Sequence, residues 1–193
     1  MKSALLAAAQ FLYLYAPLLL SAAVSGVIMR FDWLRPLRRP IDFGLTLRGK
    51  RVFGDSKTWR GLAVAVGGCI LGATIQRYAI GASARSLALL DYETLDVFAF
   101  GAAMGGTAIV GELPNSFVKR RLNIAPGATA SGPLSILLYV WDQIDLLTLS
   151  LPVLSFWVRV DLKLVLSSVI VGLTLHPLTS LVGYAMGARR SAR

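Results

Sequence analysis

The sequence predicts an all-α integral membrane protein with about five transmembrane helices, and its composition, apolar runs and charge distribution support this prediction. Of its 193 residues, 55% are hydrophobic and only 16% are charged, which is too apolar for an ordinary soluble domain. The apolar residues form runs of the length that crosses a bilayer, and basic residues gather between these runs. We expect one compact membrane domain over residues 1–193.

Five apolar runs mark the expected transmembrane helices. The first, Ser3 to Met29, carries no charge, and because it exceeds the apolar core of an ordinary signal peptide, we expect it to be retained. Gly61 to Gln76 and Val97 to Gly111 are shorter, as helices inside a bundle or beside a polar cavity can be. The last two runs are Leu134 to Val158 and Leu164 to Ala188.

Small and single residues inside these runs indicate how the helices pack. Gly68-x3-Gly72 offers a close helix contact, and Gly101-x3-Gly105 repeats the pattern. The only histidine, His176, directly precedes a proline, and we expect it to be packed or hydrogen-bonded rather than to act in catalysis.

The basic residues predict the orientation of the protein. Residues 30–60, residues 113–133 and the C-terminal tail hold 15 of the 20 Lys and Arg residues, so we expect them on the cytoplasmic side as two loops and a tail. The N-terminus and residue 85 would then lie outside, and residue 125 inside. The net charge of +10 suits the anionic headgroups of a cell (inner) membrane better than it suits nucleic acid.

Three carboxylates stand near the predicted cytoplasmic face. Glu112 ends the third run, and Asp142 and Asp145 lie three residues apart on one face of the fourth. Acids inside a bilayer segment are costly and mark functional sites by default. Since no Lys or Arg lies within the fourth run, we expect a bound cation to compensate the two aspartates. Carboxylate oxygens suit Mg²⁺, which commonly bridges phosphates.

Cations suited to phosphate groups stand in the two expected cytoplasmic loops. They are Lys57, Arg60, Lys119, Arg120 and Arg121. Together with Mg²⁺ they would suit a triphosphate and a phosphate ester, in a groove where a cytoplasmic nucleotide meets a lipid phosphate. The expected reaction is nucleotidyl transfer, with catalysis by positioning and charge neutralisation.

Several motifs, in order along the chain, closely resemble those of CDP-archaeol synthases. They are Pro40-Ile41-Asp42-Phe43-Gly44, Gly54-Asp55-Ser56-Lys57-Thr58-Trp59-Arg60-Gly61, Ser116-Phe117-Val118-Lys119-Arg120-Arg121-Leu122, Pro126-Gly127-Ala128, Asp142-Gln143-Ile144-Asp145 and Thr174-Leu175-His176-Pro177-Leu178-Thr179. Ser116-x2-Lys119-Arg120 and Asp142-x2-Asp145 are also distantly similar to the end signature of phosphatidate cytidylyltransferases.

This resemblance implies a Mg²⁺-dependent enzyme with five spans that transfers a cytidylyl group from CTP to a membrane lipid phosphate. The residues concerned are Asp142, Asp145 and Lys119 in catalysis; Asp142, Asp145 and Glu112 at the metal; and Asp55, Lys57, Thr58, Arg60, Asn115, Ser116, Arg120 and Arg121 at the substrate. Glu112 stands where the family usually has Asp. The identity of the lipid, and the choice between a monomer and a homodimer, stay open.

Three other functions fit the sequence less well. An ion-coupled transporter would spread its acids across the depth of the bilayer, whereas these acids gather near one face. A non-catalytic scaffold, with the acids merely paired to Lys or Arg, leaves the motifs at 54–61 and 116–121 unexplained. A CDP-alcohol phosphotransferase would show a longer aspartate pattern with acids four residues apart, which this sequence lacks.

Overall fold

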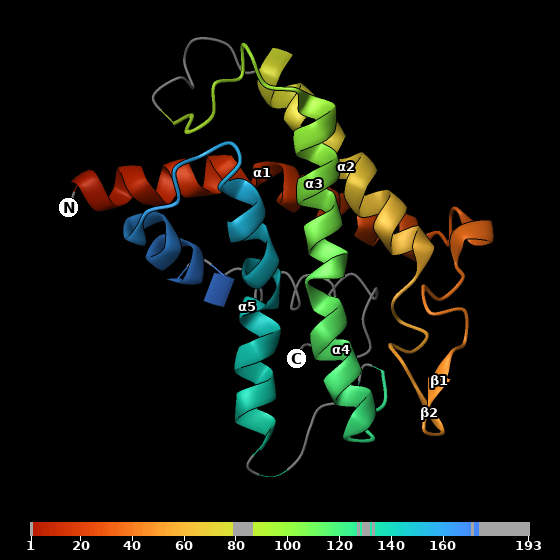
Figure 1. The fold of residues 1–193 in the computed structure, drawn as a ribbon. Coiled ribbons are helices and arrows are strands. Elements are labelled where there is room, and N and C mark those ends of the chain that lie inside the picture. Colours follow the sequence, from red (N-terminus) through yellow and green to blue (C-terminus); the bar gives the residue numbers. More distant parts are fainter. Residues whose placement is uncertain are drawn as a thin grey trace.

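The structure is a computed structural model that describes residues 2–78, 87–126, 128, 132, 134–170 and 172–173. Its elements are α1 (Lys2–Arg30), the 3-10 helix η1 (Arg35–Leu37), the strands β1 (Thr46–Leu47) and β2 (Lys50–Arg51), α2 (Trp59–Tyr78), α3 (Val97–Val110), α4 (Glu112–Arg121) and α5 (Leu134–Leu154) (Figure 1). Residues 162–170 form a further helix. Within the described residues the two short antiparallel strands are the only sheet, so the predicted all-α class is confirmed.

Four helical stretches are long and apolar enough to cross a membrane. They are Leu5–Arg30, Trp59–Tyr78, Val97–Arg121 and Leu134–Leu154. They correspond to the first four predicted spans, which are confirmed by length and composition. Most of the fifth predicted span lies outside the described residues, and so does His176.

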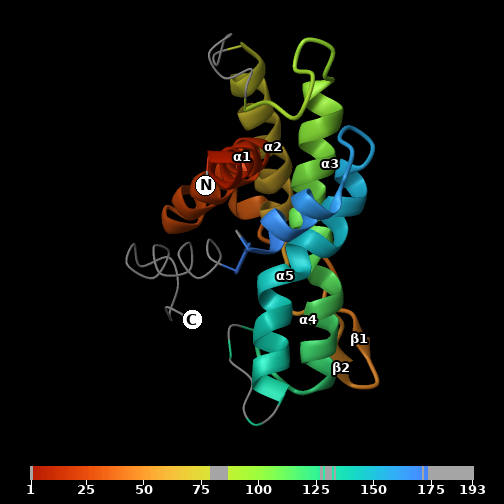
Figure 2. The same cartoon turned by 90° about the vertical axis from the view of Figure 1, so that its left-hand side faces the viewer.

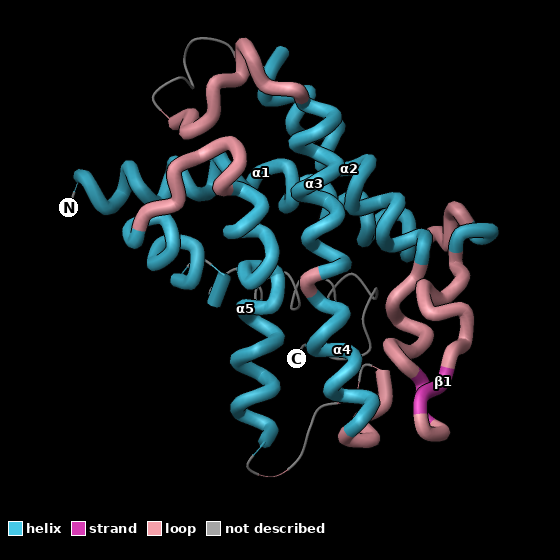
Figure 3. Tube along the Cα trace, in the orientation of Figure 1, coloured by secondary structure: helices cyan, strands magenta, loops and turns pink. Residues whose placement is uncertain are grey.

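The third span is longer than the sequence analysis predicted. The prediction ended it at Gly111 and placed a loop over residues 113–133, but residues 112–121 are helical and continue the span as α4 (Figure 3). Gly111 keeps helical dihedral angles, with φ −60° and ψ −31°. Pro114 stands in the first turn of α4, where a missing N–H is tolerated. The predicted loop is therefore wrong for residues 113–121.

Two glycines of α2 let α1 cross it closely. α1 runs at a steep angle to α3, α4 and α5, as Figures 1 and 2 show from two sides. A Cβ atom added to Gly68 would lie 2.7 Å from the Cα atom of Ser21, and one added to Gly72 would lie 2.6 Å from the Cα atom of Pro17. The predicted close contact at this glycine pair is confirmed, because any side chain there would collide with the α1 backbone.

The hydrophobic core lies where α3 meets α1, α2 and α5. Phe100 and Met104 of α3 are completely buried, at 0% and 1% exposure. A Cβ atom added to Gly101 would lie 2.5 Å from the Cα atom of Ile70, so α3 also packs closely against α2. Beyond this core, α4 and α5 continue side by side (Figure 2). This side-by-side arrangement brings the predicted site residues of the two helices together.

Candidate active site

The two aspartates of α5 are joined by an amide from α4. Asn115 donates hydrogen bonds from Nδ2 to Asp142 Oδ1 at 2.6 Å and to Asp145 Oδ2 at 3.0 Å. Asn115 and Asp145 are buried, at 3% and 7% exposure, whereas Asp142 is half-buried. Because two acids at i and i+3 share one face of α5, a single amide on the neighbouring helix reaches both. We call these three residues the Asn–Asp cluster.

Lys119, one turn further along α4, pairs with Asp142. Its ammonium group donates to Oδ1, the same oxygen that accepts from Asn115. The expectation that a bound cation compensates both aspartates depended on the absence of Lys and Arg from the fourth run, but Lys119 reaches Asp142 from the neighbouring helix. Among the described residues no cation pairs with Asp145, whose Oδ1 accepts from the N–H of Leu146 at 2.7 Å.

Glu112, the first residue of α4, pairs with Lys57 from the preceding long loop. Both residues lie within electrostatic range of Asp145. A Cβ atom added to Gly111 would lie 3.0 Å from the carbonyl oxygen of Asp145, so this end of α4 also packs against α5. Within the described part of the chain no three acidic, histidine or cysteine side chains form a metal-binding group, so the predicted set of Asp142, Asp145 and Glu112 does not converge.

Backbone pairing fixes the segment that carries Lys57. The N–H of Ile41 donates to the Lys57 carbonyl at 2.8 Å, which joins the 40–44 motif to the 54–61 motif. Thr58 then caps α2, since its Oγ1 accepts from the N–H of Gly61 at 3.1 Å. Thr58 was predicted to bind substrate, and the structure gives it this local contact.

Asp42 holds the long loop in shape. Its Oδ1 accepts from Arg51 at 2.6 Å and from the N–H of Gly44 at 3.1 Å, and its Oδ2 accepts from the N–H groups of Phe53 and Gly54 at 2.9 and 3.0 Å. Burial raises the pKa of this carboxyl, but the guanidinium and the N–H donors outweigh burial and hold the pKa at about 2. Asp42 is not among the predicted site residues, although an aspartate two residues before a glycine is typical of such turns.

Arg121 clamps the β1–β2 hairpin onto α4. Its guanidinium donates to the carbonyls of Leu47, Lys50 and Arg51 at 2.5, 2.9 and 2.6 Å. It also lies 5.0 Å from the ring centre of Phe117. Lys50 completes the clamp by donating to the Arg121 carbonyl at 2.8 Å. Arg121 is among the predicted substrate residues, but its guanidinium contacts the protein backbone instead.

Two more predicted substrate residues also contact the protein itself. Arg60 is buried and donates to Asp32 Oδ1 at 2.7 Å and to the Trp33 carbonyl at 3.2 Å. Asp55 is exposed and pairs with Arg51 at 2.6 Å. None of the contacts described for Arg60 or Asp55 reaches the Asn–Asp cluster.

Arg120 lies against the 54–61 motif. A Cβ atom added to Gly54 would lie 3.4 Å from Cδ of Arg120 and 3.3 Å from Cγ of Pro126. Gly54 also has a φ of +90°, so both its conformation and its neighbours favour glycine. The Nε atom of Arg120 is buried and unpaired, and among the described residues no acid or carbonyl accepts from this guanidinium. Ser116, which was also predicted to bind substrate, is buried and directly follows Asn115 in the sequence.

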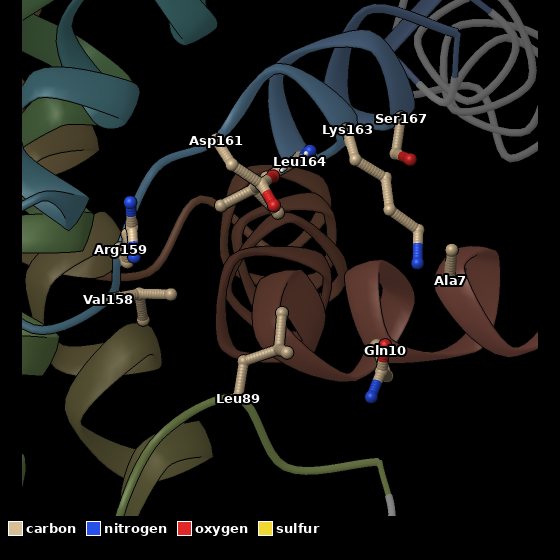
Figure 4. A pocket seen from close by; sticks show the side chains of 9 residues that line it. All are labelled: Ala7, Gln10, Leu89, Val158, Arg159, Asp161, Lys163, Leu164 and Ser167. Atoms are coloured by element: carbon tan, nitrogen blue, oxygen red, sulfur yellow. Dashed lines mark hydrogen bonds between the residues drawn. The ribbon is translucent and has the colours of Figure 1, made fainter.

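A separate small pocket lies between α1 and the helix over residues 162–170. Its lining residues are Ala7, Gln10, Leu89, Val158, Arg159, Asp161, Lys163, Leu164 and Ser167 (Figure 4). Asp161 begins the helix by accepting from the N–H of Leu164 at 2.8 Å. No residue predicted for the active site lines this pocket, so we leave it out of the candidate site.

The sequence matches one known family over almost its whole length. A family model described as CarS-like, CDP-archaeol synthase, matches residues 10–191. The chain belongs to the CDP-archaeol synthase family. The family and the enzyme class predicted from the sequence are thereby confirmed.

Several members of the CDP-archaeol synthase family are similar to this chain. The enzyme of Pyrobaculum calidifontis is 34% identical over 155 residues, which cover 79% of this chain and 81% of that protein. The enzyme of Halobacterium salinarum is 33% identical over 161 residues, covering 78% and 81%. The enzyme of Pyrococcus furiosus is 43% identical over 97 residues, covering 48% and 52%.

The fold is also known from a solved structure. It is described as an intramembrane enzyme for archaeal membrane lipids biosynthesis, and it aligns with a TM-score of 0.61 over 88% of this chain and 92% of that chain. At 23% sequence identity the likeness concerns the fold. The four apolar spans identify this member of the CDP-archaeol synthase family as a multi-pass membrane protein.

Proposed function

We propose that this chain transfers the cytidylyl group of CTP to the phosphate of a membrane lipid. An oxygen of the lipid phosphate attacks the α-phosphorus of CTP, and the bond to the β-phosphate breaks, so that pyrophosphate leaves and a CDP-activated lipid forms. The Asn–Asp cluster beside two lysines supports this proposal most strongly. Phosphoryl and nucleotidyl transfer depend on positioning and charge neutralisation, which acids, an amide and cations in one place can provide.

The Asn–Asp cluster has the chemistry of a magnesium site. Asp142 and Asp145 supply carboxylate oxygens, which are hard ligands. Asn115 Oδ1 is a buried oxygen without a hydrogen-bond partner among the described residues, and it belongs to the side chain whose amide nitrogen joins the two acids. An unsatisfied buried acceptor beside two acids suits a cation. When bound, Mg²⁺ would neutralise charge on the nucleotide phosphates.

The lysines exchange partners when the nucleotide binds. In the structure Lys119 forms an ion pair with Asp142, and Lys57 forms one with Glu112. A triphosphate carries more negative charge than one carboxylate, so both ammonium groups turn toward phosphate oxygens and release the acids. Arg120, whose guanidinium has no acceptor among the described residues, adds a third cation for the phosphates. These groups stabilise the charge that develops on the leaving pyrophosphate.

The site faces the cytoplasm of an inner (cell) membrane in this proposal. CTP is a cytoplasmic nucleotide, and residues 30–60 and 113–133, which lie beside the Asn–Asp cluster or contribute to it, hold 12 of the 20 Lys and Arg residues. The names of the relatives make an ether-linked isoprenoid lipid phosphate the first candidate for the acceptor.

A transfer assay tests the proposal. Purified protein in mixed micelles receives CTP labelled at the α-phosphate, Mg²⁺ and one lipid phosphate at a time: an ether-linked isoprenoid phosphate, a diacyl phosphatidate or a polyprenyl phosphate. We expect label in the lipid fraction with the ether lipid. Absence of labelled lipid with every acceptor would exclude the proposed reaction.

Two lysine variants connect the reaction to the site. Lys57→Ala and Lys119→Ala are expected to raise KM for CTP or to lower kcat while the protein still inserts in the membrane. Lys163→Ala, an exposed lysine in the separate pocket, is the matched control and should keep wild-type kinetics. Full activity in both site variants would remove the phosphate-binding role from these lysines.

A further inference from the structure

The long loop between α1 and α2 and the first residue of α2 expose a series of large apolar side chains. Eight of them are between 39% and 70% exposed: Phe31, Trp33, Leu34, Leu37, Phe43, Leu45, Leu47 and Trp59. Two aromatic pairs stand among them, Phe31 with Trp33 at 5.6 Å between ring centres and Phe43 with Trp59 at 6.0 Å. We call these eight residues the apolar shelf. Eight exposed large apolar side chains within 29 consecutive residues, four of them in two aromatic pairs, exceed the ordinary scatter of single exposed apolar residues.

The backbone of the loop is built to turn these side chains outward. Leu34 and Phe43 have φ angles of +56° and +48°, a region that is unfavourable for bulky residues. The hydrogen bonds of Asp42 and the ion pair between Arg60 and Asp32 hold the loop in this shape. A strained conformation that exposes leucine and phenylalanine needs a gain elsewhere, and contact with an apolar medium would provide it.

Arginines are interleaved with the shelf. Arg35, Arg38, Arg39 and Arg48 are exposed, and the first two also share the carboxylate of Asp32 at 3.1 and 3.6 Å. The upper part of the shelf lies where α1 ends and α2 begins, on one side of the molecule (Figure 1). Both helices are apolar enough to cross a membrane, so we expect the segment that joins their ends to lie at a membrane surface.

We propose that the apolar shelf is embedded in the headgroup layer of the same bilayer, with its arginines bound to anionic lipid phosphates. Aromatic side chains and arginines together suit the membrane interface, because the rings lie among the acyl chains and headgroups while the guanidinium groups bind anionic lipid phosphates. In a two-fold dimer the same surface of two copies would meet, so the exposed arginines would face each other, and this like-charge repulsion argues against a second copy of this chain as the occupant. This inference does not depend on the proposed reaction.

Fluorescence quenching locates the shelf in the bilayer. The chain has four tryptophans, so the triple variant Trp59→Phe, Trp141→Phe and Trp157→Phe leaves Trp33 as the only one. In vesicles, we expect lipids with a spin label near the headgroup to quench Trp33 more than lipids labelled deep in the chain. Quenching by aqueous acrylamide alone, without quenching by either lipid, would overturn the proposal.

A second measurement tests the arginines. Cys69 is the single cysteine and is completely buried, so its reaction with a thiol-specific dye reports thermal unfolding. Wild-type protein should unfold at a higher temperature in vesicles with phosphatidylglycerol than in pure phosphatidylcholine. The double variant Arg39→Gln, Arg48→Gln should lose about half of this difference, because basic residues at a bilayer surface each attract anionic lipid.

Arg159→Gln is the matched control, since Arg159 is exposed but lies in the separate pocket. It should keep the full phosphatidylglycerol effect. An equal loss in Arg159→Gln, or no loss in the double variant, would contradict lipid binding by the shelf. A Trp33 signal shielded from both lipids and acrylamide, together with a crosslinked dimer through the shelf, would assign the surface to a second copy instead.

Discussion

At the scale of single residues, the Asn–Asp cluster distinguishes two aspartates that look alike in the sequence. Asp142 has both a lysine and an amide as donors, whereas Asp145 has an amide and a backbone N–H. Asp145 is also more deeply buried than Asp142. Removing the charge therefore has opposite consequences for stability at the two positions.

Asp145→Asn is expected to keep or raise the thermal unfolding midpoint of the metal-free protein, because it removes a buried charge that lacks a cation partner among the described residues. Asp142→Asn should lower the midpoint, since it leaves Lys119 without its carboxylate. Both variants should lose at least about 100-fold in Mg²⁺-dependent CTP turnover. Dye labelling of Cys69 measures the unfolding midpoints, and the transfer assay measures the turnover. Normal activity in either purified variant would exclude that aspartate from catalysis.

Asn115→Ala tests the residue that joins the two acids. Loss of the amide removes two hydrogen bonds, so the two carboxylates repel each other without a donor between them. We therefore expect kcat to fall about 10- to 100-fold, the range typical of residues that support a metal site. The Mg²⁺ concentration for half-maximal activity should rise in parallel. Thr148→Ala on α5, which removes only a hydroxyl bonded to the Asp145 carbonyl, is the control and should change neither value.

At the scale of elements, α4 serves two structures at once. One face presents Asn115 and Lys119 to α5, and its C-terminal end holds the β1–β2 hairpin through Arg121. The neighbouring Arg120 instead faces Gly54 of the long loop. Two adjacent arginines thus have different tasks, which their shared position in a basic triplet conceals.

Arg121→Ala is predicted to act on stability, and Arg120→Ala on the nucleotide. Loss of three carbonyl contacts should destabilise the protein by about 2 kcal/mol and make residues 45–51 more sensitive to protease. Arg120→Ala should raise KM for CTP with little change in the unfolding midpoint. Limited proteolysis and steady-state kinetics on the two variants separate these effects, and a reversed pattern would show that the two roles were assigned the wrong way round.

The long loop should give a measurable pH dependence through Asp42. Its folded pKa of about 2 lies below the ordinary value of 3.8, so its stabilisation is complete above about pH 4 and is lost as the pH falls through 2. At neutral pH this stabilisation amounts to about 2 kcal/mol. Asp42→Asn should therefore be less stable than wild type at pH 7, and the difference should shrink below pH 4. A difference that stayed constant from pH 7 to pH 3 would contradict this account.

At the scale of the whole molecule, the charge distribution predicts how the chain sits in the membrane. Cysteine substitution at residue 125 should be labelled only after the membrane is opened, and substitution at residue 85 should be labelled from outside in intact cells. Cys69 is buried and provides an unreactive background. Labelling of residue 125 from outside would reverse the orientation and with it the cytoplasmic location of the site.

Local pattern by itself determined the membrane class, the presence of the first four spans, the close contact at Gly68-x3-Gly72 and the position of Asp142 and Asp145 on one helix face. These features depend on the spacing of residues within a single helix, which the order of amino acids specifies directly. The family could also be predicted from the sequence, because several motifs occur in the same order along the chain as in CDP-archaeol synthases.

Tertiary structure alone decided which donors meet which acceptors. Arg121 donates to carbonyls about 70 residues earlier in the chain, those of Leu47, Lys50 and Arg51. Arg60 donates to Asp32. The sequence does not distinguish a basic residue that binds a phosphate from one that binds the backbone or a carboxylate of the protein. The continuation of α3 into α4 had the same origin: Gly111 and Pro114 suggest a break, but packing of the Gly111 backbone against α5 keeps the chain helical. Contacts between distant segments are set by how helices pack, and the periodicity of one segment carries no information about its partner.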